Sequence, residues 1–148
     1  MKVIAVDPGD QRIGIAISDL TGTIANPLTI IKHVSRQQDA AAIIELAAQH
    51  QADLIIIGQA LDDEGMSTTQ SRKAARLASV IKKQTNLPVR LWDESGSTDA
   101  VQQALIKTGA TKRRRRRHLD DLAATYILQS FLDNYADNSS IETQDDQT

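Results

Sequence analysis

The N-terminal segment reads Val3-Ile4-Ala5-Val6-Asp7-Pro8-Gly9-Asp10-Gln11-Arg12-Ile13-Gly14-Ile15-Ala16-Ile17-Ser18. Residues 3–7 are apolar up to the terminal Asp7, which is typical of a buried strand, and residues 12–18 alternate as a second strand does. The four residues between them are Pro, Gly, Asp and Gln, which favour a turn. The segment therefore predicts a β-hairpin at the start of the chain.

The rest of the chain predicts helices and strands in alternation. A turn at residues 21–23 leads to a third strand around residues 28–31. A helix follows, with apolar positions Ala40, Ile43, Ile44 and Ala47 on one face. The all-apolar run at residues 54–57, ending at Gly58, indicates a central parallel strand. The remaining predicted elements are a helix at about 67–84, a strand at 89–92, a helix from 98 or 99 to before Gly109, and a last helix at about 119–135. The last helix has two apolar ridges, Ala123/Ile127/Phe131 and Ala124/Leu128/Leu132.

This order predicts an α/β fold with a mixed five-stranded sheet flanked by helices. The sequence indicates one domain over residues 1–135. Residues 136–148 contain four acidic residues and no basic residue, and they predict a disordered acidic tail.

Composition excludes several classes of protein. The chain has 148 residues, of which 41% are hydrophobic and 24% charged, as in an ordinary globular protein. It has no cysteine, which excludes disulfides and thiolate metal sites. No apolar stretch approaches the roughly 20 residues of a membrane span, and the N-terminus lacks the pattern of a signal peptide. We therefore expect a cytoplasmic protein that does not contact a membrane.

The net charge of −2 conceals one concentrated basic segment. Without it, the remaining chain would carry 11 basic and 19 acidic residues, a charge of −8. Such a run is often only a solvated loop, but beside acidic residues it favours contact with a phosphate-rich substrate. Aromatic residues are only 3% of the chain, so no platform for base stacking is evident. The predicted phosphate-binding run consists of Lys112, Arg113, Arg114, Arg115, Arg116 and Arg117.

Acidic residues occur where predicted strands end. Asp7 ends the first strand, the pair Asp93-Glu94 ends a later one, and Asp120 opens the last helix. Open α/β sheets place their sites at the carboxyl ends of the strands. Clustered carboxylates are difficult to bury unless cations neutralise them, and a pair of magnesium ions would do so. The pattern suggests a metal-dependent nuclease.

Four segments together resemble the YqgF/RuvX family, whose members are described as Holliday junction resolvases and pre-16S rRNA nucleases. Residues 6–19 are similar to the family's opening D-x-G-x-x-R-I-G-x-A-x-S-D, the most specific match. The other three segments are Ile56-Ile57-Gly58-Gln59-Ala60-Leu61, Trp92-Asp93-Glu94-Ser95-Gly96-Ser97-Thr98, and Asp120-Asp121-Leu122-Ala123-Ala124 followed by Ile127-Leu128-Gln129.

The resemblance implies a ribonuclease H-like fold and a phosphodiesterase that uses Mg²⁺ or Mn²⁺. Asp7, Glu94 and Asp120 match the family's catalytic, metal-holding acids. The implied partners are nucleic acid, either an rRNA precursor or branched DNA, and the ribosome. The oligomeric state, monomer or homodimer, is left open, as is the choice for Arg12 between supporting the hairpin and contacting a phosphate.

The chain also departs from the family pattern. Gln59-Ala60 stands where Leu-Pro is usual, and Ser95-Gly96 stands where Arg-Leu is usual. The lost arginine leaves one cation fewer beside the acids. Two alternatives therefore remain: a non-catalytic module for nucleic-acid binding or ribosome assembly, and an actin-like phosphotransferase, which shares the D-x-G hairpin but needs a second lobe.

Overall fold

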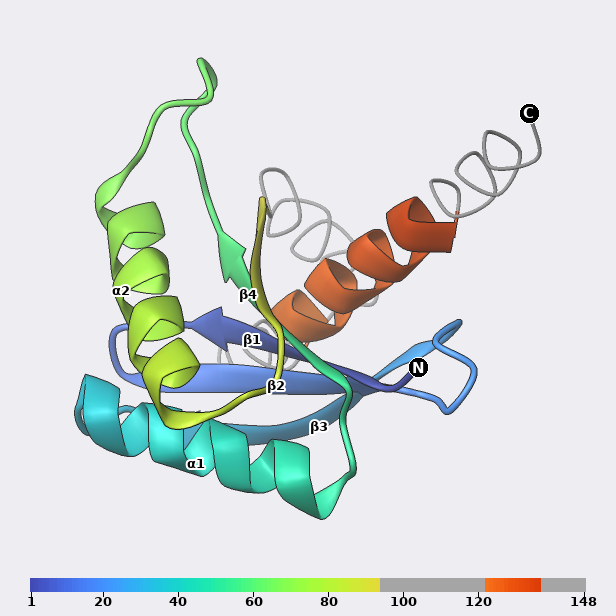
Figure 1. Ribbon diagram of the computed structural model, residues 1–148. Helices are drawn as coiled ribbons and strands as arrows, with labels where there is room; N and C mark the ends of the chain where they lie inside the picture. The colour runs from blue at the N-terminus through green and yellow to red at the C-terminus, as the bar shows by residue number, and fades with distance from the viewer. Residues whose placement is uncertain (94–121, 137–148) are drawn as a thin grey trace, which may run out of the picture.

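The computed structural model describes residues 1–93 and 122–136, and its central feature is a five-stranded sheet (Figure 1). The strands are β1 (Val3–Pro8), β2 (Arg12–Ser18), β3 (Ala25–Lys32), β4 (Leu54–Gln59) and β5 (Val89–Asp93), in the spatial order β3-β2-β1-β4-β5. The first three strands pair antiparallel, whereas β1, β4 and β5 run parallel. The predicted mixed five-stranded sheet is confirmed.

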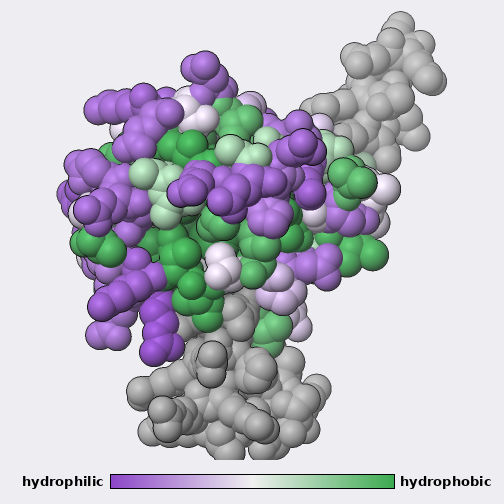
Figure 2. Space-filling model, turned by 90° about the horizontal axis from the view of Figure 1, so that it is seen from below, coloured by the Kyte–Doolittle hydropathy of each residue, from purple (hydrophilic) through white to green (hydrophobic). Residues whose placement is uncertain are grey.

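Two helices cover one face of the sheet. Helix α1 (Arg36–Gln49) begins after its N-cap Ser35, and α2 (Thr69–Gln84) begins after Thr68, which forms a capping box with Ser71. Their buried residues pack against alternate strand residues, including Ile4, Val6, Ile13 and Ile15. Figure 2 shows the molecule from below the view of Figure 1, and on this face hydrophobic residues gather in the central part, with hydrophilic residues around and across them.

A C-terminal helix covers the opposite face, and residues 122–136 of it are described. Both predicted apolar ridges, Ala123/Ile127/Phe131 and Ala124/Leu128/Leu132, are buried. The helix packs on Val3, Ala5 and Ile56, which alternate with the strand residues that face α1 and α2. Ala136 lies in this helix, one residue beyond its predicted end. The rest of the predicted tail and the predicted helix from 98 or 99 lie outside the described residues.

Gln129 fastens the C-terminal helix to the start of β3. Its Oε1 accepts a hydrogen bond from the Ala25 N–H at 2.9 Å, and its Nε2 donates to the Thr23 carbonyl oxygen at 3.0 Å. One amide side chain thus satisfies a backbone donor and a backbone acceptor in the β2–β3 connection. Gln129 therefore has a structural role in the described residues.

The motif residues Ser18 and Asp19 organise the same end of the sheet. The buried Ser18 Oγ accepts the Val3 N–H at 2.8 Å, which fixes the start of β1. Asp19 Oδ1 accepts the Thr23 N–H at 2.8 Å, and Oδ2 accepts the Thr21 hydroxyl at 2.7 Å. These hydrogen bonds lower the pKa of Asp19, and the bond from the Thr21 hydroxyl has the largest effect. Both residues lie at the end of the sheet remote from Asp7.

No helix among the described residues is long and apolar enough to cross a membrane.

Candidate functional site

Asp7 lies near the end of β1 and is half-buried. The alternation of β1 places Val3 and Ala5 on the face covered by the C-terminal helix, so Asp7 belongs to that face too. Its cross-strand partner on β2 is Gly14. On the other side, Val6 pairs with Ile57, so the next residue of β4 beside Asp7 is Gly58. Both neighbouring strands therefore present a glycine here, and neither adds a side chain beside the Asp7 carboxylate.

The three parallel strands end at the same edge of the sheet, as the sequence predicts. Gly58 on β4 pairs with Trp92 on β5. Asp7, Gly58 and Trp92 are therefore neighbours across the three parallel strands. Trp92 packs against the core under the C-terminal helix. The next residue, Asp93, is exposed and follows Trp92 on the strand, so it belongs to the other face. This placement favours the interpretation that Asp93 is not the functional member of the Asp93-Glu94 pair.

The other predicted site residues lie outside the described residues. Glu94 directly follows the last described residue of β5, and Asp120 precedes residue 122 by two positions. The basic run at residues 112–117 lies in the same undescribed range. Across residues 1–93 and 122–136, no group of three or more His, Cys, Asp or Glu side chains could hold a metal ion. The three-acid site therefore stays a prediction.

The turn after Asp7 is too tight for a side chain at position 9. A Cβ atom on Gly9 would lie 2.4 Å from the carbonyl oxygen of Arg12, a backbone atom that cannot swing aside. The glycine of the D-x-G pattern is therefore required by the close approach of two backbone segments. The carbonyl oxygen of Gln11 accepts the His33 N–H at 3.0 Å, which joins this turn to the end of β3.

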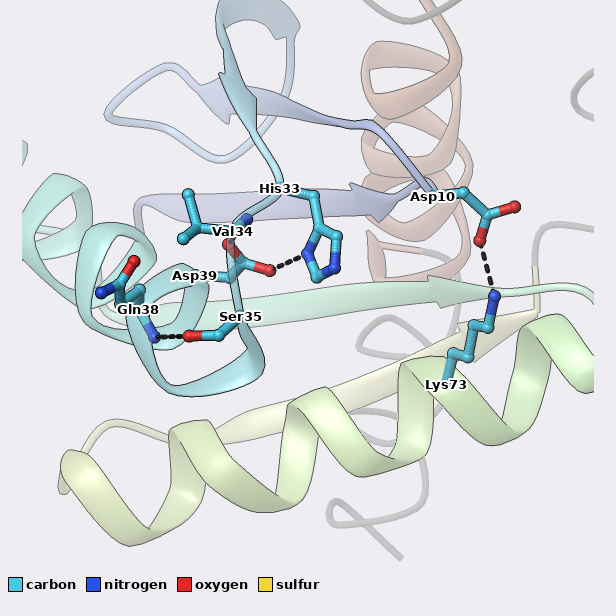
Figure 3. A network of polar contacts seen from close by, with 7 residues as sticks. All are labelled: Asp10, His33, Val34, Ser35, Gln38, Asp39 and Lys73. Atoms are coloured by element: carbon cyan, nitrogen blue, oxygen red, sulfur yellow. Dashed lines mark hydrogen bonds and ion pairs between the residues drawn. The ribbon is translucent and has the colours of Figure 1, made fainter.

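An ion pair joins the same turn to α2. Lys73 Nζ donates to Asp10 Oδ1 at 2.6 Å, as Figure 3 shows. The hydrogen bond from Lys73, followed by its positive charge, lowers the pKa of Asp10. Both side chains are exposed, so the pair fixes the turn without being part of the core.

A second polar pair joins the end of β3 to α1. Asp39, in the first turn of α1, is only 4% exposed; its Oδ1 accepts the Val34 N–H at 3.0 Å, and its other oxygen is bonded to His33 Nδ1 (Figure 3). The side chain of His33 is partly exposed, and its bond to a buried acid is not evident from the sequence. The spacing of four residues between Asp39 and Ile43 indicates only that Asp39 lies on the buried face of α1, and it does not identify His33 as its partner.

A small cavity of about 130 Å³ lies between these two pairs. Pro8, Gly9, Ile13 and Leu77 supply apolar walls, and His33, Arg36, Asp39 and Lys73 supply the polar rim. Pro8 and Ile13 pair across the hairpin on the α1 and α2 side, the face opposite Asp7. The cavity therefore lies behind the candidate site and not within it.

Arg12, the one predicted phosphate-binding residue that is described, lies at the start of β2 and is exposed. Its neighbour Ile13 faces α1 and α2, so Arg12 belongs to the opposite face, together with Gly14 and Asp7. The described residues thus bring Asp7 and Arg12 to one face at the same end of the hairpin.

Comparisons with known proteins identify the family of the chain. A family model described as "RuvX: Holliday junction resolvase" matches residues 1–134. A relative from Thermoanaerobacter pseudethanolicus named "Putative pre-16S rRNA nuclease" is 37% identical over 135 residues, covering 90% of this chain and 97% of the relative. A relative of the same name from Clostridium acetobutylicum is 31% identical over 134 residues, covering 90% and 99%.

Solved structures with a similar fold include two proteins in complex with a Holliday junction. T. thermophilus RuvC in complex with Holliday junction substrate has a TM-score of 0.53 at 14% identity, covering 91% of this chain and 96% of that one. The fowlpox virus resolvase with Holliday junction DNA has a TM-score of 0.54 at 16% identity, covering 91% and 99%. These comparisons confirm the family resemblance, the fold class and the nuclease class predicted from the sequence. The chain therefore belongs to the RuvX family and is a nuclease with the ribonuclease H-like fold of RuvC.

Proposed function

We propose that this nuclease hydrolyses phosphodiester bonds of precursor 16S ribosomal RNA with the help of divalent metal ions. The observation that carries the proposal is the position of Asp7 at the carboxyl edge of three parallel strands, beside Gly14 and next in register to Gly58. The choice of RNA rests on the names of the full-length relatives. Such a substrate implies a cytoplasmic protein that meets the assembling ribosome.

The residues around Asp7 fit a hydrated Mg²⁺ or Mn²⁺ ion. A carboxylate is the oxygen ligand that these ions prefer, and Mg²⁺ keeps several waters when it is bound. The two flanking glycines add no side chain next to Asp7, whereas any larger residue would place one there. Glu94 and Asp120 are proposed to complete the set of ligands. When bound, a metal pair activates water and stabilises the leaving oxygen.

The protein itself would hold and orient the substrate. Arg12 is proposed to contact a phosphate on the Asp7 face, and the run at residues 112–117 is proposed to add further phosphate contacts. Recognition would then depend on backbone charge and shape, since the chain has few aromatic residues for base stacking.

The substitution Asp7→Asn tests the assignment against a matched control. Asp93→Asn removes the same charge at the same edge, from an exposed residue on the other face. We expect Asp7→Asn to abolish cleavage of a pre-16S rRNA fragment in Mg²⁺ or Mn²⁺ and to keep both the melting temperature and RNA affinity. Asp93→Asn should retain cleavage. Unchanged cleavage by Asp7→Asn would refute the proposal, and binding without cleavage by the wild type would favour the non-catalytic assembly module.

A second candidate substrate is a four-way DNA junction, which the description of the family model favours. Resolution of a junction requires two symmetric cuts and hence two active sites in a dimer. The same cleavage assay should include a four-way junction and a linear duplex of equal length, with the molar mass of the protein measured in parallel. Faster paired cutting of the junction by a dimer would favour the resolvase.

A further inference from the structure

We propose that Lys32 forms, together with Arg12, a subsite for a backbone phosphate that flanks the scissile bond. The proposal rests on the proposed nuclease function and adds a contact to it. Lys32 is the last residue of β3, and its partner in the antiparallel register is Arg12. Directly opposed residues of antiparallel strands present their side chains on the same face.

The register places both cations on the Asp7 face. Ile31 and Ile13 are partners and belong to the core under α1 and α2, so the next pair, Lys32 and Arg12, belongs to the other face. Asp7 is the partner of Gly14, two residues from Arg12 along β2. With strands about 4.8 Å apart and a rise of about 3.4 Å per residue, the Cα atoms of Asp7 and Lys32 are roughly 12 Å apart. A phosphate at Lys32 would therefore lie a few nucleotides from one at Asp7.

Two like charges opposite each other are unfavourable in a sheet unless an anion lies between them. Lys32 is exposed, and within residues 1–93 and 122–136 it has no ion-pair partner. A phosphate bound beside both residues would be attracted by the charge of Lys32 and by that of Arg12. An exposed lysine without an ion pair among the described residues contributes little to folding, so this placement favours a role in binding.

The surface around the pair is hollowed. An open groove of about 560 Å³ at the end of β3 is lined by Arg12, Ile30, Ile31, Lys32 and His33, with Asp10 and Gln11 from the turn. Asp10 is the one acid of this lining, and Lys73 already pairs with it (Figure 3). Ile30 adds a half-buried apolar surface next to the cations. An open, cationic groove with a partly apolar floor suits an extended sugar-phosphate strand better than a small enclosed ligand.

The first test is the salt dependence of binding to a pre-16S rRNA fragment, measured in an Asp7→Asn background to prevent cleavage. Lys32→Gln should lower the slope of log affinity against log salt by about 0.7 to 0.9 and weaken binding roughly fivefold near 0.15 M salt. Lys32→Arg should restore both. The control Lys83→Gln removes an exposed lysine from the last turn of α2, on the other side of the sheet, and should change neither.

The second test locates the phosphate. Single phosphates of the fragment are replaced one at a time by neutral methylphosphonates. One position flanking the cleavage site should weaken binding of the Asp7→Asn protein but have no further effect when Lys32→Gln is also present. The melting temperature of Lys32→Gln should not fall, because Lys32 is exposed and has no ion pair among the described residues to lose, whereas a structural lysine would lower it.

The outcomes separate this proposal from the proposed function. If the wild type cleaves and Lys32→Gln behaves as Lys83→Gln does, the Lys32 subsite is refuted and the nuclease assignment stands. If the wild type neither binds nor cleaves any nucleic acid, both are refuted.

Discussion

Lys73 and Asp10 are separated by 63 positions in the sequence, yet Nζ of one lies 2.6 Å from Oδ1 of the other. The pair ties α2 to the turn that follows Asp7 (Figure 3). Because Lys73 lowers the pKa of Asp10 below its ordinary value of 3.8, folding and ionisation of Asp10 are linked. The stabilisation is fully present above pH 3.8 and is lost as the pH falls through the lowered native pKa.

We predict that Lys73→Gln returns the pKa of Asp10 towards 3.8 and removes this part of the acid dependence of stability. NMR titration of the Asp10 carboxyl and urea unfolding at neutral and acidic pH would measure the two effects. At neutral pH the loss should be small and should shrink with added salt, since the pair is exposed. Asp10→Asn should produce the same loss, and the double variant should lose no more than either single one.

Gly9→Ala should disturb the turn and the Asp7 site together. The added Cβ would lie 2.4 Å from the carbonyl oxygen of Arg12, so the hairpin must open. Overpacking of this kind costs about 1–3 kcal/mol. We expect lower stability in urea and a loss of cleavage that persists at temperatures where the variant is folded. Gln11→Ala, an exposed side chain in the same turn, serves as the control, and equal behaviour of the two variants would contradict the prediction.

The spacing of apolar residues predicted the fold because the residues of a buried face recur at regular intervals along a helix or a strand. The run at residues 54–57 and the two ridges of the C-terminal helix are buried as expected. β3 is longer than predicted, starting at Ala25 instead of near residue 28. Pro27 is tolerated there because β3 is an edge strand and the register shifts beside Pro27, and prolines within sheets are found at edges and bulges.

The candidate site was predictable only in part. A strand pattern followed by a D-x-G turn predicts that Asp7 lies at the carboxyl end of the first strand, and the structure confirms this position. The links of Asp10 to Lys73 and of His33 to Asp39 join distant or differently folded segments, and no local periodicity encodes such pairs. The glycines beside Asp7 follow from register between strands, which the pattern of a single strand does not specify.

Gln129 is predicted to act in stability and not in catalysis. Gln129→Ala removes the side-chain partner of the part-buried Ala25 N–H and of the exposed Thr23 carbonyl oxygen, at a cost of about 0.5–1.5 kcal/mol. Urea unfolding should show this loss, while kcat at a temperature where the variant is folded should equal that of the wild type. Gln84→Ala, at the exposed end of α2, is the control. A fall in kcat for Gln129→Ala without loss of stability would contradict the structural role.

Ala60 stands where the family has proline, and the structure gives this difference a consequence. The Ala60 N–H donates to Gln70 Oε1 at 2.6 Å, and the Ala60 carbonyl oxygen accepts the Thr68 hydroxyl at 2.5 Å. A proline has no N–H, so Ala60→Pro would break the first bond and leave the Gln70 oxygen without this donor. Restoring the usual family residue should therefore destabilise this chain by about 1 kcal/mol.

The loss of the Ala60–Gln70 hydrogen bond in Ala60→Pro can be measured separately from the effect of proline on backbone freedom. Proline can also stabilise by reducing the freedom of the unfolded chain. In a Gln70→Leu background the hydrogen bond is already absent, so Ala60→Pro should cost less there than in the wild type. Urea unfolding of the four proteins of this cycle measures the difference. An equal cost in both backgrounds would show that the Ala60–Gln70 hydrogen bond does not hold the β4–α2 connection in place.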